Sequence, residues 1–203
     1  MVFAPLFTGL VFSTIYITGW YFKTRHMGAP PHGIISDSML FAVPPSLWLS
    51  VLVMWLFFRK SGSFSDLFAT RTNSLAKDIL AGTLLGGFWI AIYGMMGYPS
   101  FSSMVALNLH KLQAVPGALS AGFCEEFIFR GLLIGLVVRA GGGKTEQVIW
   151  SAVLFGMAHI FRGAWGMLFT VLLGSTLAGV CIARRSIWPA VIAHSLLNLF
   201  IEP

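Results

Sequence analysis

The sequence predicts an all-α protein: a polytopic bundle of about seven transmembrane helices in one domain over residues 1–203. Composition is the first reason, because 57% of the 203 residues are hydrophobic and only 10% are charged. Soluble domains carry about 25% charged residues. The second reason is that the apolar residues form runs near the length of about 20 residues that crosses a bilayer. No polar block between these runs is long enough to form a second domain.

Seven apolar runs are expected to form the membrane helices. In chain order they cover roughly residues 3–22, 38–58, 79–97, 116–138, 147–161, 164–183 and 187–201. The fifth and seventh runs are short, which favours tilted helices or helices sheltered by their neighbours. The stretch 98–115 is ambiguous and is interpreted as an interfacial helix; for the bundle as a whole, eight membrane helices are the alternative to seven.

Local signals support individual elements. The first run ends in Trp20-Tyr-Phe22, aromatic residues typical of a membrane interface. Pro44-Pro45 predicts a kink in the second run, which membrane helices tolerate when neighbours satisfy the freed carbonyls. Gly82-x-x-x-Gly86 in the third run and Gly131-x-x-x-Gly135 in the fourth are spaced for close helix contacts. Residues 59–78 form the longest polar connection.

The charge pattern predicts the orientation. Loops after the second, fourth and sixth runs carry eight Lys and Arg residues, whereas loops after the first, third and fifth carry four. By the positive-inside rule, the N-terminus is cytoplasmic. We expect an integral multi-pass protein, with a prokaryotic cytoplasmic membrane as its location. The net charge of +6 is explained by these loops and by anionic headgroups, so no nucleic-acid partner is expected.

The fourth run contains charged residues where lipid disfavours them. A charged side chain at the bilayer centre costs about 2.5–3.5 kcal/mol on insertion scales. Glu126 and Arg130 are four residues apart, so they share a helix face and can pair. Glu125 is rotated by about 100° from Glu126 and can point elsewhere. One carboxylate is thus held by the arginine while the other is left for a water molecule.

Two further apolar runs each carry a histidine. Phe155 and His159 are four residues apart in the fifth run, as are His194 and Asn198 in the last. Together with the two glutamates, they form a set suited to amide hydrolysis. A carboxylate can take a proton from water, aided by a histidine, and a second histidine with an amide can stabilise an oxyanion. The same Glu and His residues could instead bind a catalytic zinc ion, although a His-Glu-x-x-His motif is absent.

At these residues the chain resembles the CPBP (CAAX protease and bacteriocin-processing, or Abi) family of intramembrane proteases, which includes the type II CAAX prenyl proteases. The three motifs of that family occur in order and cover about the last 90 residues. They read Glu125-Glu126-x-x-x-Arg130, Phe155-x-x-x-His159 and His194-x-x-x-Asn198. The match defines a motif-bearing catalytic half at about 116–203.

The resemblance implies roles for the six residues. Glu125 would activate water with the aid of His159, and His194 and Asn198 would form the oxyanion side. Glu126 and Arg130 would hold the motif in place. The family has been described both as metalloproteases and as glutamic proteases; we favour the metal-free form, with no cofactor firmly implied.

The expected function is therefore an intramembrane endopeptidase whose substrate is a membrane-associated protein or peptide. Two alternatives from other classes remain. A proton-coupled transporter could use the same carboxylates as a relay, although no pair of interrupted spans in matching halves is visible. A non-catalytic immunity or binding protein of the membrane is the other. The sequence does not indicate whether the protein is a monomer or an oligomer.

Overall fold

The computed structural model describes residues 48–49, 51–52, 56, 74–96, 109–160 and 163–201. This part of the chain is helical and contains no strand, which confirms the all-α class. The run expected at 3–22, most of the run at 38–58 with Pro44-Pro45, and most of the connection 59–78 lie outside the described residues. The number of membrane helices therefore stays a prediction.

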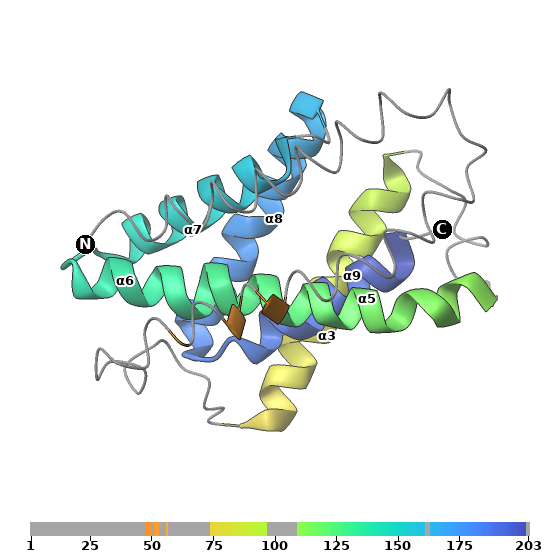
Figure 1. Cartoon of the computed structure of the whole chain (residues 1–203), viewed down its shortest axis with the longest axis horizontal. Coiled ribbons are helices and arrows are strands. Elements are labelled where there is room, and N and C mark those ends of the chain that lie inside the picture. Colours follow the sequence, from red (N-terminus) through yellow and green to blue (C-terminus); the bar gives the residue numbers. More distant parts are fainter. Residues whose placement is uncertain are drawn as a thin grey trace.

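The described residues from Leu75 onward form five rods (Figure 1). The first is α3 (Leu75–Met95), and the second is a continuous rod of α5 (Leu109–Glu126), the π-helical turn η2 (Phe127–Leu132) and α6 (Leu133–Arg139). They are followed by α7 (Lys144–Ala158), α8 (Gly163–Arg184) and α9 (Trp188–Ile201). Each of the last five predicted runs corresponds to one of these rods.

The second rod begins earlier than its apolar run. The run was expected from residue 116, but α5 starts at Leu109 and contains Pro116 in its interior. Residues 109–115 of the ambiguous stretch 98–115 thus belong to this rod, and residues 97–108 lie outside the described part. Membrane helices tolerate an internal proline where neighbours or local adjustments satisfy the freed backbone groups.

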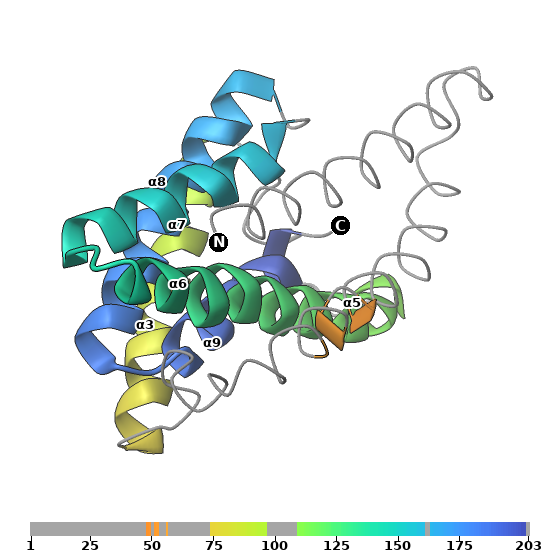
Figure 2. The ribbon, with the colours of Figure 1, turned by 60° about the vertical axis from the view of Figure 1, so that its left-hand side comes forward.

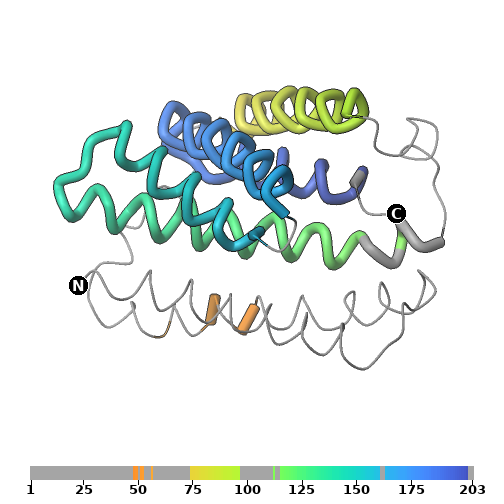
Figure 3. Tube along the Cα trace, turned by 90° about the horizontal axis from the view of Figure 1, so that it is seen from above, coloured from red at the N-terminus to blue at the C-terminus, as the bar shows by residue number. Residues whose placement is uncertain are grey.

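The rods are stacked in layers (Figures 2 and 3). In Figure 3, α3 lies at the top and α8 and α9 lie below it. The rod of α5, η2 and α6 comes next, with α7 beside it. The main packing partners are α3 with α9, α7 with α8, and α5 with α9. The central apolar cluster lies between the layers and includes Trp89, Ile128, Phe155, Leu177 and Leu197.

Small residues allow α3 to approach α9. A Cβ atom added at Gly82 would lie 2.7 Å from both Ile192 Cβ and Pro189 O. One at Gly86 would lie 3.2 Å from Ala193 Cα. The close contact expected for the first glycine pair is therefore confirmed. The prediction for Gly131 is wrong, because a Cβ there would meet only Phe127 of its own rod.

A buried carboxylate joins α3 to the turn between α8 and α9. Asp78 is fully buried, and its Oδ1 accepts a hydrogen bond from Arg184 Nε at 2.9 Å. Its Oδ2 accepts one from Ser186 Oγ at 2.7 Å. Because the charge of Asp78 is balanced, α3 extends through this residue and begins four positions before the predicted run.

The outer surface of the described helices differs from that of a soluble protein. Large apolar side chains are exposed along the outer faces of three rods: Leu80, Leu84 and Phe88 on α3, Trp150 and Met157 on α7, and Trp165, Leu168 and Leu172 on α8. Glu126 and Arg130 are fully buried. A soluble monomer rarely exposes apolar patches on this scale. Two of the described helices, α3 and α8, are long and apolar enough to cross a bilayer.

Candidate active site

Five of the six predicted site residues meet where three rods come together. The second rod supplies Glu125, Glu126 and Arg130, the end of α7 supplies His159, and α9 supplies His194. Phe155 lies between them, with its ring centroid 4.7 Å from that of His159 and 5.6 Å from that of His194. The site is therefore assembled around one buried aromatic ring.

Arg130 is held from three sides. Its Nη1 donates to Glu126 Oε1 at 3.0 Å, as their spacing predicted, and both side chains are 0% exposed. Its Nη2 donates to the carbonyl of Gly174 on α8 at 3.2 Å. Its Cζ lies 4.4 Å from the centroid of the Phe155 ring, a cation–π contact. The arginine thus joins the second rod to both α7 and α8.

Glu126 has a second partner that the sequence did not reveal. Its Oε1 lies 2.7 Å from His194 Nδ1, although the two residues are 68 positions apart. A carboxylate only accepts hydrogen bonds, so the proton of this bond is on Nδ1. In a neutral His194 ring the lone pair is consequently on Nε2.

His159 is oriented in the same way by its own helix. Its Nδ1 lies 2.9 Å from the carbonyl oxygen of Phe155, one turn earlier. Because a carbonyl oxygen accepts only, Nδ1 carries the proton, and Nε2 of the neutral ring is an acceptor. The hydrogen bond made by Nδ1 thereby selects the tautomer, as is common for histidines at functional sites.

Both Nε2 atoms are directed at the remaining carboxylate. Glu125 Oε2 lies 3.8 Å from His159 Nε2 and 4.0 Å from His194 Nε2. Within the described part of the chain, this oxygen has no hydrogen-bond partner. The separations exceed a direct hydrogen bond, and at such distances a bridging water is the natural intermediary. Glu125 and His159 are each 12% exposed, so the site is nearly closed within the described residues.

The same three atoms are less suited to zinc. Ligands at about 2.0–2.2 Å in a tetrahedral shell place donor atoms about 3.4 Å apart, and both observed distances are longer. Among the described residues, no group of three His, Cys, Asp or Glu side chains is arranged to hold a metal ion. The observed spacing of the three atoms is thus wider than that of a zinc shell.

Asn198 is the sixth predicted site residue. It lies on α9 one turn after His194 and is partly buried, and no hydrogen bond within the described residues joins it to the rest of the set. Sequence reasoning also missed Gly174 of α8, whose carbonyl accepts from Arg130, and Ser151 of α7, which donates to the carbonyl of Phe129 next to the site. Neither residue belongs to a motif; their importance comes from helix packing, which leaves no local sequence signal.

These observations define a class: an all-helical membrane protein with two buried carboxylates and two imidazoles at the junction of three rods. Residues 107–200 match the model of a family described as type II CAAX prenyl endopeptidase Rce1-like. The chain is also 25% identical over 210 residues to "Putative membrane peptidase YdiL" of Bacillus subtilis (strain 168), covering 94% of this chain and 82% of that protein. No solved structure matches.

The two matches confirm the CPBP family that the three motifs indicated. At the level of the family, they support a CAAX-type intramembrane protease, and hence a membrane protein that acts on a peptide or protein. The catalytic roles of the individual residues stay predictions.

Proposed function

We propose that this chain hydrolyses a peptide bond of a membrane-associated protein by a metal-free mechanism in which Glu125 activates water. The observation that carries the proposal is the convergence of Glu125 Oε2 with the two Nε2 atoms at 3.8 and 4.0 Å. Both rings have their Nδ1 atoms committed to oxygen acceptors. The space between the three atoms therefore favours one molecule that can donate two protons, such as water.

The steps follow from this arrangement. His159 orients the water by accepting its second proton in a hydrogen bond at Nε2. Glu125 takes the first proton, and the water oxygen bonds to the scissile carbonyl carbon. His194 takes a proton from solvent at Nε2 when substrate binds, its positive charge balanced by Glu126; this N–H donates to the oxyanion and the proton returns to solvent after product release. Asn198, one turn further along α9, adds an amide donor. The C–N bond then breaks as the proton held by Glu125 passes to the leaving amine.

The test compares purified variants in liposomes, with a farnesylated peptide ending in a CAAX sequence and its unprenylated counterpart as probes. Wild type should cleave at least one, and Glu125→Gln, His159→Ala and His194→Ala should each lower kcat by about 100- to 10,000-fold. Glu146→Gln is the matched control, because Glu146 is exposed and only caps α7 through Gly143 N. A wild-type rate for Glu125→Gln would exclude Glu125 as the base.

Metal dependence has its own measurement. Wild-type protein is treated with a chelator and shown by elemental analysis to be free of metal. It should keep its rate of peptide cleavage. A loss of activity that zinc restores would instead favour the metallo-type alternative. The natural substrate would be sought by comparing membrane proteins that accumulate with Glu125→Gln and with wild type.

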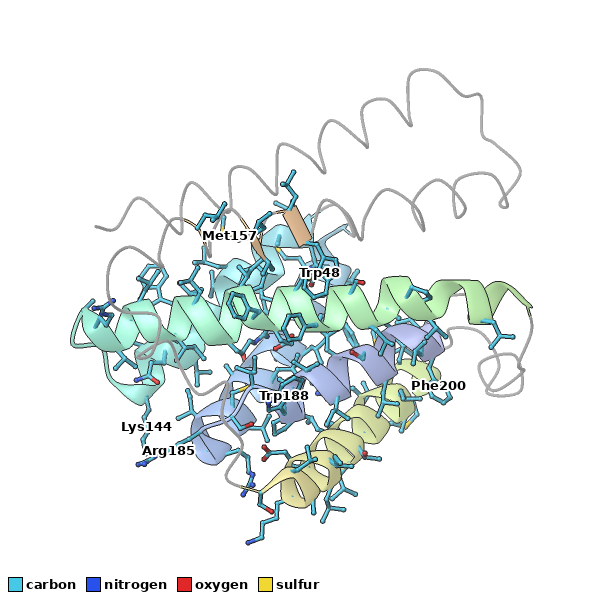
Figure 4. The ribbon with its side chains drawn as sticks, turned by 60° about the horizontal axis from the view of Figure 1, so that its bottom comes forward. Trp48, Lys144, Met157, Arg185, Trp188 and Phe200 are labelled. Carbon is cyan, nitrogen blue, oxygen red and sulfur yellow. The ribbon has the colours of Figure 1, made fainter. Side chains whose placement is uncertain are left out.

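We also propose that residues 1–203 form one membrane domain with a cytoplasmic N-terminus. Two basic residues support the orientation: Lys144 begins α7 and Arg185 follows α8, and Figure 4 shows both at the same end of the molecule. The salt bridge of Arg184 with Asp78 adds the start of α3 to that end. An impermeant maleimide should label Lys144→Cys in inside-out vesicles; labelling from the outside of intact cells would reverse the assignment.

A further inference from the structure

One face of α7 runs from the fold into the site. Ser151, Phe155 and His159 follow one another at intervals of four residues, so they form a stripe along a single helix face. Ser151 and Phe155 are fully buried. Phe155 contacts both imidazoles and Arg130, whereas Ser151 lies one turn before it and touches none of the reacting groups.

The hydroxyl of Ser151 donates to the π-helical turn of the second rod. Its Oγ lies 3.0 Å from the carbonyl oxygen of Phe129. In an α-helix that carbonyl would accept from the N–H of Leu133, four residues on. Here the Leu133 N–H bonds instead to the carbonyl of Ile128, five residues back. The π register thus diverts a donor from Phe129, and the hydroxyl from the neighbouring helix supplies another.

Phe129 is well placed to pass this restraint to the site. It is the neighbour of Arg130 and follows Glu125 by four residues, and its ring packs edge-on against Phe155 with centroids 5.3 Å apart. The Ser151 bond therefore fixes α7 against the second rod, close to the site residues that each of these two helices supplies. A slip by one residue would move a rod by about 1.5 Å and rotate it by about 100°, which would remove His159 from Glu125.

We propose that Ser151 is a positioning residue: its hydroxyl holds the π-helical turn in register, and the turn sets the gap between Glu125 and the two histidines. This inference rests on the proposed function for its catalytic consequence. The hydrogen bond and the stability of the turn do not depend on that function, so they are tested separately.

The first test is hydrogen–deuterium exchange on the full-length protein in nanodiscs. In Ser151→Ala, the amide hydrogens of residues 127–134 should exchange about five- to tenfold faster than in wild type, because the turn loses a hydrogen bond. Ser175→Ala is the matched control, since the Ser175 hydroxyl bonds to the Val171 carbonyl of its own helix at 2.9 Å. Unchanged exchange of residues 127–134 in Ser151→Ala would overturn the proposal.

The second test asks whether the register reaches the chemistry, again with the farnesylated CAAX peptide. Ser151→Ala should lower kcat by about 10- to 100-fold at a temperature well below unfolding, with KM within about twofold. Ser151→Cys, which fills the space but is a weak donor, should resemble Ser151→Ala. A wild-type kcat for either variant would overturn the positioning role. Absence of cleavage by wild type would count against the proposed function alone, because the exchange result needs no substrate.

Discussion

Replacing Arg130 by leucine should destabilise the protein strongly, and a second change should restore part of the loss. The reason is the environment of Glu126, whose side chain is 0% exposed and whose Oε1 is 3.0 Å from Arg130 Nη1. Without the arginine, the carboxylate remains buried with its charge uncompensated. Removing one partner of a buried ion pair costs about 3–5 kcal/mol.

Two further contacts place the effect at the upper end of that range. Arg130 Nη2 donates to Gly174 O at 3.2 Å, and its Cζ lies 4.4 Å from the Phe155 ring centroid. A desolvated cation–π contact of this kind contributes about 2 kcal/mol. We therefore expect Arg130→Leu to lower the free energy of unfolding by about 4–5 kcal/mol. Adding Glu126→Gln removes the buried charge but keeps an oxygen acceptor for His194, so the double variant should regain about 2 kcal/mol.

The measurement is a double-mutant cycle on reversible unfolding in mixed micelles of a mild detergent and SDS. Lys144→Leu serves as the control, because Lys144 is exposed at the start of α7 and its loss should change stability by less than about 0.5 kcal/mol. A cost for Arg130→Leu below about 1 kcal/mol, or a double variant no more stable than the single one, would refute the reasoning.

Three other substitutions test the packing around the site. Gly174→Ala should lower kcat, because its Cβ would lie 3.0 Å from Phe155 Cδ1 and 3.2 Å from Arg130 Nη2; Gly179→Ala on the same helix, which meets nothing within 4 Å, should not. Gly82→Ala should cost about 1–3 kcal/mol of stability by separating α3 from α9, whereas Gly87→Ala, also open within 4 Å, should be neutral or stabilising. Asp78→Ala should cost about 2–4 kcal/mol, since Ser186 and Arg184 lose their acceptor, yet leave kcat per folded molecule unchanged. Thermal unfolding measures the stability of each variant, and initial rates measure its kcat. Equal effects of Gly174→Ala and Gly179→Ala, or of Gly82→Ala and Gly87→Ala, would contradict these assignments. So would an Asp78→Ala variant that is stable but has a lowered kcat.

The class of fold was predictable because it depends on composition and on runs of apolar residues. The last five predicted runs each correspond to a rod. The predicted and observed limits differ by a few residues, except at the start of the rod formed by α5, η2 and α6. That start was missed because Pro116 and the polar residues before it resemble a helix end. The extension of α3 through Asp78 was missed because its charge is balanced by Arg184, more than a hundred positions away.

Within the site, the sequence by itself determined the contacts that helix periodicity dictates. Glu126 and Arg130 pair because four residues make about one turn, and Glu125 points elsewhere because adjacent residues differ by about 100°. Only the tertiary structure decided that His194 donates to Glu126, that both Nε2 atoms face Glu125, and that Ser151 bonds to Phe129. Helix geometry acts over a few residues and can be read along the chain. The relative register of two rods results from packing summed over whole interfaces, so no local pattern encodes it.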